Sequence, residues 1–323
     1  MTKPDTQRVM PFEPTRLMPF DPTRAGFGRH ETFPMRYAWL PKGFSALEEA
    51  ADAFESDDAT IKLGVGKNMV SSIRFWLRVA GMVEQAGKRV VATELGRRLL
   101  GSNGWDPYLE DEGTLWLIHW LLATNSGLAT TWWWFFNRFH KAEFTSQEVG
   151  HSIQDFTREH IPKPPSLNTV KQDVAVLLRM YSPPRATART PIEESLDSPL
   201  STLSLVDYAS AGRRYSSRPA SRDALPAEIV GFCLCDLLAA SDSPSIAIED
   251  LMYSRGGKSA PGSVFRLTES ALLAKIERVV EAYPDSFELR ETAGLHQVFA
   301  LRAVEPLEFL HGYYAQSVQE EVA

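Results

Sequence analysis

Cysteine is scarce in this chain of 323 residues, which contains only Cys233 and Cys235. Two cysteines in a C-x-C arrangement cannot form the disulfide framework of a small secreted protein, and we find no partner residues for a metal site. Both cysteines lie in the apolar run EIVGFCLCDLL. Because free cysteine is among the most frequently buried residue types, we expect both thiols to pack unpaired in the core.

Long apolar stretches are also missing. No run approaches the roughly 20 apolar residues that a membrane-spanning helix requires, and the N-terminal segment lacks the apolar centre of a signal peptide. Hydrophobic residues make up 44% of the chain and charged residues 23%, which is ordinary for a globular protein. We therefore expect a cytoplasmic protein without membrane contact, large enough for two or three domains.

Positive charge is in deficit over the whole chain, whose formal net charge is −7. Residues 61–100 are the exception, because they contain eight Lys or Arg against two acids, a local net charge of +6. A cationic segment on an acidic protein marks where a polyanion could dock. The segment is therefore the first candidate for a nucleic-acid contact.

The same segment has the pattern of a winged helix-turn-helix. The corner Gly64-Val65-Gly66 suits a steep turn between helices, because glycine tolerates positive φ. Short β-prone pairs at 82–83 and 90–91 flank a basic turn, and Thr93 is placed to cap a last helix over 94–100. The predicted helix over 67–80 has apolar residues at spacings of three and four, which form one buried face: Met69, Val70, Ile73, Trp76, Leu77 and Ala80.

The opposite face of that helix and the basic turn have side chains that reach phosphates and base edges. We expect DNA contacts from Lys67, Asn68, Ser71, Arg74, Arg78, Lys88 and Arg89. Two alternatives stay open, namely a solvated basic face and a protein-docking module. Nucleotide binding at Gly64-Val65-Gly66-Lys67 is rejected, because Ile61 and Asn68 stand where a phosphate-binding loop needs glycine and Ser or Thr.

Candidates for chemistry lie on either side of this segment. His30 and Glu31 are adjacent and could act in acid–base catalysis, although such pairs are more often structural. Asp106, Glu110 and Asp111 form the best carboxylate cluster, so we consider Asp106 a catalytic candidate and all three as ligands of Mg²⁺. The alternative is that these acids stabilise the start of the next helix through its macrodipole.

The sequence predicts a mainly α-helical fold with short β-hairpins, of the α+β class. An extended arm with a near-repeat, MPFEPTR and MPFDPTR, occupies residues 1–26, and the winged helix-turn-helix domain follows over 27–104. An aromatic-rich helical region over 105–182 contains a second helix-turn-helix-like unit and six of the eight tryptophans, which we expect in the core. An irregular Pro/Ser/Arg-rich segment over 183–225 precedes a C-terminal helical domain over 226–323 with a terminal β-hairpin.

Four longer motifs resemble a bacterial family. They are FGRHETFPMRYAWLPKGF, LGVGKNMVSSIRFW, GWDPYLEDEGTLWLIHW and TTWWWFF, and the resemblance extends from about residue 27 to residue 311. The family, long of unknown function, consists of SspB-like proteins encoded beside DNA phosphorothioation genes. The N-terminal arm with its near-repeat departs from the family pattern.

The resemblance implies a role in antiviral defence, in which the protein nicks double-stranded DNA so that sulfur can enter the backbone. Implied partners are a cysteine desulfurase, an ATP-pyrophosphatase-like sulfur carrier and an ATPase. The resemblance supplies no catalytic motif that can be transferred to numbered positions here. A Mg²⁺-dependent nickase, a non-catalytic DNA-binding adaptor and a transcriptional regulator of the system therefore stay open, and so does a homodimer.

Overall fold

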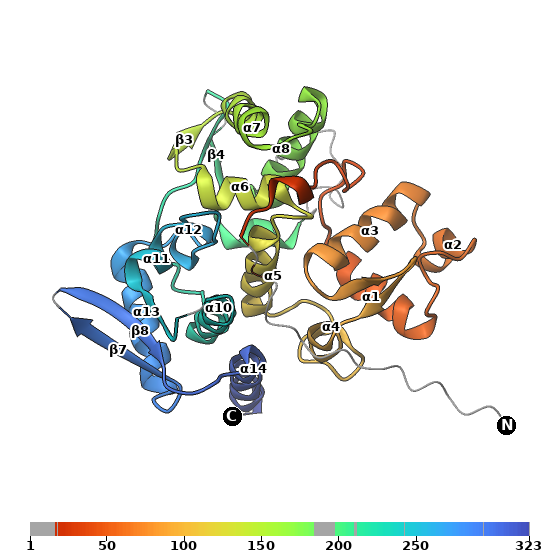
Figure 1. Ribbon diagram of the computed structural model, residues 1–323. Helices are drawn as coiled ribbons and strands as arrows, with labels where there is room; N and C mark the ends of the chain where they lie inside the picture. The colour runs from red at the N-terminus through yellow and green to blue at the C-terminus, as the bar shows by residue number, and fades with distance from the viewer. Residues whose placement is uncertain are drawn as a thin grey trace.

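The computed structural model describes residues 17, 19–183, 198–209, 212–241, 243–292 and 294–322. The expected α+β class is confirmed, because helices dominate and three small antiparallel sheets accompany them (Figure 1). Most of the predicted N-terminal arm, and residues 184–197 of the Pro/Ser/Arg-rich segment, lie outside the described residues. The predicted domain boundaries stay predictions, and buried apolar residues form one cluster that includes both Leu17 and Tyr314.

The N-terminal unit consists of four helices and one hairpin, drawn in orange to yellow in Figure 1. A short 3-10 helix, η1 (Pro22–Arg24), precedes it. Its elements are α1 (Trp39–Glu49), α2 (Ala59–Leu63), α3 (Lys67–Val79), β1 (Val83–Ala86), β2 (Arg89–Ala92) and α4 (Glu94–Leu100).

Helix α3 follows the glycine corner as the sequence predicts. Gly64 ends α2 with φ +57°, in the left-handed region that favours glycine, and Gly66 begins α3 in an extended conformation. The predicted buried face is confirmed at Val70, Ile73 and Trp76, which are at most 7% exposed. Phe75 and Val79 widen that face, so α3 is anchored in the core along most of its length.

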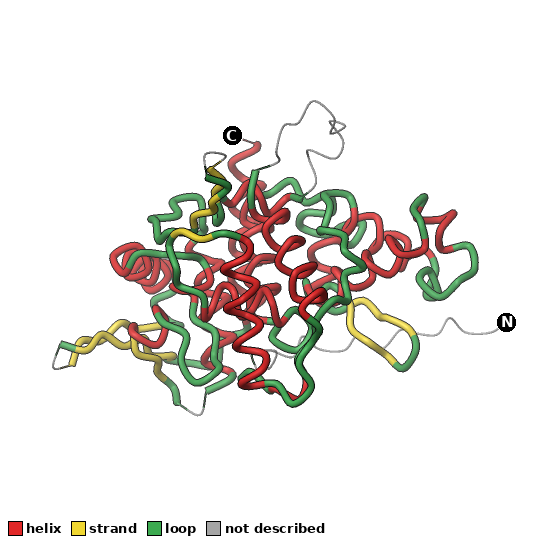
Figure 2. Tube along the Cα trace, turned by 90° about the horizontal axis from the view of Figure 1, so that it is seen from above, coloured by secondary structure: helices red, strands yellow, loops and turns green. Residues whose placement is uncertain are grey.

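The hairpin after α3 joins two short strands whose register pairs Val83 with Ala92 and Ala86 with Arg89. Gly87 turns the chain with φ +62°, and Figure 2 shows this hairpin projecting from the helical body. Thr93 caps α4 by accepting a hydrogen bond from the Gly96 backbone N–H, at 3.0 Å. The hairpin tip is therefore an exposed extension on a fixed base.

Helices α5 (Glu112–Thr124) and α6 (Thr130–Arg138) lie in the middle of the molecule (Figure 1). Every residue of α5 after Glu112 is buried, as expected of a helix that is apolar all round. The expectation that the tryptophans are mainly core is confirmed, since five of the six between 105 and 134 are buried. The aromatic region is thus a shared centre against which the other elements pack.

Two buried polar residues tie α5 and α6 to the C-terminal half. His119 of α5 is hydrogen-bonded through Nδ1 to the Tyr181 hydroxyl and through Nε2 to the Val264 carbonyl, both at 2.9 Å. Arg266 donates from Nη2 to the Phe135 and Phe139 carbonyls at 2.8 Å, and so caps the C-terminal end of α6.

A helical pair, α7 (Ser146–His160) and α8 (Leu167–Tyr181), packs beside α6 (Figure 1). Thr145 and Glu148 form a capping box at the start of α7, and Ser166 caps α8. The 3-10 helix η2 (Pro199–Leu203) follows α8 and packs against it. A small sheet of β3 (Glu143–Phe144), β5 (Arg214–Ser216) and β4 (Asp207–Ala209) lies nearby.

The C-terminal part packs α10 against α13 and α14 and adds a second three-stranded sheet, β6-β8-β7. Residues 245–247 pair as a strand with residues 297–299, and a short helix begins directly after them at Ile248. The predicted hairpin is confirmed, although Ala293 of its turn lies outside the described residues. The elements are α10 (Ala227–Ala239), β6 (Ser245–Ala247), α11 (Ile248–Met252), α12 (Pro261–Val264), α13 (Glu269–Ala282), β7 (Phe287–Thr292), β8 (Leu295–Ala300) and α14 (Pro306–Val322).

The fold can be compared with two expectations, one from the small number of cysteines and one from the lack of long apolar runs. Cys233 and Cys235 are buried and unpaired in α10, as predicted. Among the helices of the described ranges, none combines the length and apolar character needed to cross a membrane.

Candidate nucleic-acid interface

The outer face of α3 has the polar side chains that the sequence assigned to DNA. Lys67 and Asn68 are exposed in the first turn, and Ser71, Arg74 and Arg78 are half-buried further along. Positions 67, 71, 74 and 78 follow at helical spacing, so these side chains form one stripe along the helix. We call Lys67, Ser71, Arg74 and Arg78 the α3 stripe.

Arg74 has one acidic neighbour. Its Nη1 lies 3.3 Å from Oε1 of Glu55, and both side chains are partly exposed. Ion pairs of this kind contribute at most about 1 kcal/mol, because water and salt screen them. An incoming phosphate could therefore compete for Arg74 at little cost.

Arg78 lies in a positive environment. Partial burial lowers the pKa of Arg78, and the charges of Arg74 and then Arg29 lower that pKa further. Arg29 belongs to the loop before α1 and is exposed. Sequence reasoning did not assign Arg29 to the surface formed by Arg74 and Arg78.

Lys88 and Arg89 lie at the hairpin tip and are exposed. The amide Nε2 of Gln85 donates to the carbonyls of Gly87 and Arg89, both at 2.9 Å, and so braces the turn from inside. The tip therefore presents two cations on an ordered turn. The DNA-binding role of these seven residues, from Lys67 to Arg89, stays a prediction.

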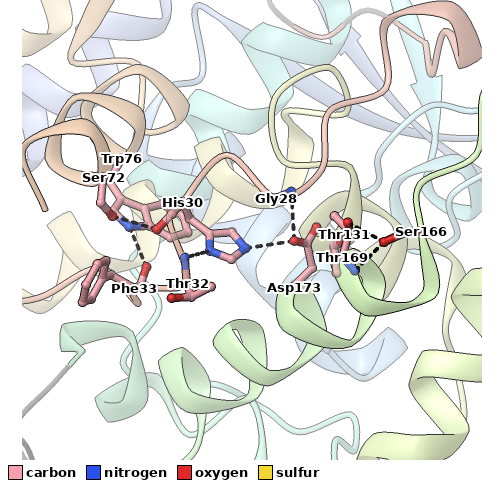
Figure 3. Close-up of polar contacts among 10 residues, drawn as sticks. All are labelled: Gly28, His30, Thr32, Phe33, Ser72, Trp76, Thr131, Ser166, Thr169 and Asp173. Carbon is pink, nitrogen blue, oxygen red and sulfur yellow. Dashed lines mark hydrogen bonds and ion pairs between the residues drawn. The ribbon is translucent and has the colours of Figure 1, made fainter. Parts of the chain in front are cut away.

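Behind the α3 stripe lies the loop of residues 26–33, which joins α3 to the α6–α8 region (Figure 3). Its anchor on that side is Asp173 of α8, which is 1% exposed. Asp173 Oδ1 accepts the Gly28 backbone N–H and is bonded to His30 Nε2, both at 2.9 Å, while Oδ2 accepts the Thr131 hydroxyl at 2.7 Å. A carboxylate has four lone-pair sites, so Asp173 can accept all three of these hydrogen bonds.

On the other side, the loop is fixed to α3. The Ser72 hydroxyl donates to the His30 carbonyl at 3.1 Å, and the Trp76 indole Nε1 donates to the Phe33 carbonyl at 3.2 Å. The His30 ring also stacks on the Trp76 ring, with centroids 6.1 Å apart and planes 11° from parallel. His30 therefore contacts α3 and α8 at once.

The geometry gives His30 a structural role, and its catalytic role stays a prediction from the sequence. The Thr32 backbone N–H donates to His30 Nδ1 at 3.1 Å, so the proton of the neutral ring is on Nε2, where it points at Asp173. Both ring nitrogens are occupied and the residue is 1% exposed. His30 has no free nitrogen for acid–base work and acts as a structural link. Glu31 is exposed with φ +49°, and its carboxylate takes no part in the hydrogen bonds of His30 and Asp173 described above.

Two of the carboxylates after α4, those of Asp106 and Asp111, have structural roles. Asp106 is 6% exposed, and its two oxygens accept the backbone N–H groups of Glu110 and Asp111 at 2.9 and 3.1 Å. Asp111 caps α5 by accepting the Thr114 N–H at 3.1 Å, and it also accepts the Tyr313 hydroxyl at 2.9 Å.

In the described part of the chain, no group of three or more His, Cys, Asp or Glu side chains is placed to hold a metal ion. The structure therefore does not bring Asp106, Glu110 and Asp111 together as one three-ligand group, and their catalytic and Mg²⁺-binding roles stay predictions from the sequence. The macrodipole alternative agrees with Asp111 as the N-cap of α5.

Sequence reasoning missed Asp173, Thr131 and Arg29. A usable signal existed for Asp173, because a carboxylate inside the apolar stripe of a predicted helix, between Val170 and Val174, must have a buried partner. The identity of that partner had no sequence signal, since His30 is 143 positions away. Arg29 is significant only once its loop is known to lie on α3.

Comparison with known proteins gives a family and two solved structures. Residues 27–314 match a family described as "Protein of unknown function (DUF4007)". The chain is similar to an SspB crystal structure and to a magnesium-ion-bound SspB crystal structure, each with 29% sequence identity and a TM-score of 0.80. Each match covers 90% of this chain and 88% of the compared chain. The resemblance to SspB-like proteins is thereby confirmed, and no curated protein matches.

Proposed function

Because the chain belongs to the DUF4007 protein family, and because it is similar to SspB over most of its length, we propose that it is a double-stranded-DNA-binding component of a bacterial DNA phosphorothioation system. The observation that supports this most is the α3 stripe. It places cations and short polar groups along the outer face of a helix whose other face is buried.

We propose further that α2, the glycine corner, α3 and the β1–β2 hairpin act as a winged helix-turn-helix. In this arrangement α3 enters the major groove and Asn68 and Ser71 reach base edges. Lys67, Arg74 and Arg78 contact phosphates, and Lys88 and Arg89 at the hairpin tip contact the adjacent backbone. The acidic remainder of the chain favours this one face for DNA.

The direct test is binding of a labelled duplex of about 30 base pairs over a series of salt concentrations. The triple variant Lys67→Ala, Arg74→Ala and Arg78→Ala should lose affinity, and its salt slope should fall by about three, since each phosphate contact contributes about one. The control Arg255→Ala, Lys258→Ala and Arg278→Ala removes three exposed cations outside this unit and should bind like the parent. Equal binding by both triples would refute α3 as the DNA-contacting helix.

DNA nicking is a separate part of the proposal. It is motivated by the SspB resemblance and by the magnesium ion in one SspB structure. The described residues supply no three-ligand metal group, so no cleavage step is assigned to them. If the protein is a nickase, purified protein with Mg²⁺ should convert supercoiled plasmid to open circle, and EDTA should stop the conversion.

A non-catalytic adaptor is the second candidate, and it is favoured by the structural roles of His30, Asp106 and Asp111. An adaptor should bind DNA with the same salt dependence but leave the plasmid supercoiled. It should also retain a cysteine desulfurase, sulfur carrier or ATPase of the system in a pull-down from co-expressing cells. A transcriptional regulator would instead give a footprint on the promoter of its own operon.

A further inference from the structure

Arg29 occupies an unusual position in the loop of residues 26–33. The residue before it is fixed by the hydrogen bond from the Gly28 N–H to Asp173, and the residue after it is fixed through its ring and its carbonyl. The side chain of Arg29 itself is exposed. A long flexible side chain is thus mounted on backbone that has little freedom, which reduces the entropy lost when its guanidinium binds a ligand.

The loop holds Arg29 against α3. The hydrogen bond from Ser72 to the His30 carbonyl places the backbone just after Arg29 on the helix, and the His30 ring meets the Phe75 ring edge-on, with centroids 6.3 Å apart. Phe75 lies one turn before Arg78 on α3. Arg74 and Arg78 are four residues apart and therefore lie on one face of α3. The three guanidinium groups consequently come from two segments that the sequence separates by more than 40 residues.

Charge at this place is one-sided. Among the described residues, Glu55 is the carboxylate that forms an ion pair with one of the three arginines, and its partner is Arg74, at 3.3 Å between partly exposed side chains. The positive charges of Arg74 and Arg29 both act on Arg78, whose pKa they lower after the larger effect of burial. Converging like charges raise the free energy of the unbound protein, and an anion placed among them would relieve that repulsion.

We propose that Arg29, Arg74 and Arg78 together form a binding site for one phosphate of the DNA backbone, beside the groove that α3 enters. This inference rests on the proposed DNA-binding function and adds a residue and a ligand to it. Guanidinium groups suit the role because each can donate two parallel hydrogen bonds to phosphate oxygens. Phosphate contacts carry no base information, so the site fixes the register and tilt of α3 on the duplex.

The anchoring of the loop gives the site a second consequence. The same backbone that carries Arg29 is bonded to Asp173 of α8, and Gly28 lies against Thr169 of that helix. The position of the phosphate relative to α3 therefore depends on how the α7–α8 pair packs against the loop of residues 26–33. DNA bound at this site contacts a surface built by both parts of the molecule, not by residues 61–100 alone.

The test compares Arg29→Ala with the parent in duplex binding over a salt series. We expect at least a five-fold loss of affinity at low salt and a decrease of about one in the salt slope. Arg29→Lys should keep the slope, because the charge remains, but recover only part of the affinity, because an ammonium group cannot bind in a bidentate manner. Arg278→Ala, which removes an exposed cation of α13, should match the parent in both measurements.

The outcomes separate this inference from the function on which it rests. If the parent protein fails to bind duplex DNA, the proposed function is wrong. If the parent binds, and the triple variant at 67, 74 and 78 loses binding while Arg29→Ala keeps the parental slope and affinity, the three-arginine site alone is overturned. Because Arg29 is exposed, its variants should unfold at the parental urea midpoint, so a loss of binding reports on the contact itself.

Discussion

His30 and Asp173 are 143 positions apart in the sequence, yet their side chains form a hydrogen bond of 2.9 Å between Nε2 and Oδ1, and both are 1% exposed. The loop that carries His30 is bonded to α3 by its backbone and to α8 by this contact. The pair therefore joins the DNA-binding candidate to the rest of the protein. It is a structural contact, which is the alternative that the sequence favoured over acid–base catalysis at this place.

Asp173→Asn should destabilise the fold by about 2 to 3 kcal/mol. The amide NH₂ would face at least one of the groups that donate to Asp173, so two donors would oppose each other in a buried place. Urea unfolding followed by tryptophan fluorescence measures the change, and Trp76 and Trp132 lie close to the His30 ring. Asp155→Asn, on the exposed side of α7, is the matched control and should change the free energy of unfolding by less than about 0.5 kcal/mol. An Asp173→Asn protein as stable as its control would show that the contact contributes little.

Arg266→Met should destabilise the fold by about 3 kcal/mol or more. The substitution removes the donor for the Phe135 and Phe139 carbonyls at the end of α6, which would then be buried without a hydrogen bond. Burial lowers the pKa of Arg266 to about 10, so the group is still charged at neutral pH. The control is Arg138→Met at the same helix end, where the side chain is exposed. Chemical denaturation of the two variants should separate them clearly, and similar midpoints would argue against the cap.

His119 should make stability depend on pH between about 6.5 and 3. Burial lowers the pKa of His119 from 6.5 to about 3. The unfolded chain takes up a proton as the pH falls through 6.5, whereas the folded chain resists until about pH 3, so acid favours unfolding across this window. From pH 7 to pH 4.5 the contribution is roughly 2.5 kcal/mol, at 1.36 kcal/mol for each pH unit below 6.5.

The measurement is urea unfolding of the parent and of His119→Gln at both pH values. Glutamine can still pair with the Tyr181 hydroxyl or the Val264 carbonyl, but it does not titrate. The stability difference between the two proteins should therefore shrink as the pH falls. A constant difference would mean that His119 is protonated in the folded state well above pH 3.

The two cysteines should be inert in the folded protein. Both are buried, and burial raises the pKa of each thiol, so thiolate is rare at pH 8. An aromatic disulfide reagent should label no thiol in buffer and both in urea. Because α10 packs against α13 and α14, a reagent reaches the two thiols only when this packing opens. Rapid labelling of the folded protein would show that it opens readily.

Local signals in the sequence predicted local structure well. Thr93 caps the helix expected after it, and the buried stripe of α3 follows its apolar spacing. These features depend on interactions within a few residues, which a single sequence records directly.

Only part of the candidate site could be predicted from the sequence. The α3 stripe could be predicted, because charge and helical spacing are local properties. The roles of His30, Asp106 and Arg29 could not, because each depends on which distant or backbone group lies beside it. A histidine next to a glutamate looks the same in sequence whether its nitrogens are free or occupied.

The long separation between His30 and Asp173 also sets an order of events during synthesis. A ribosome adds about 5 to 20 residues per second, so the loop emerges roughly 7 to 30 seconds before the carboxylate that secures it. During that interval the nascent chain can form α3 and its hairpin but cannot fix Arg29. The contact completes the N-terminal unit only after α8 has left the ribosome, so the finished surface marks a chain that has been synthesised past its midpoint.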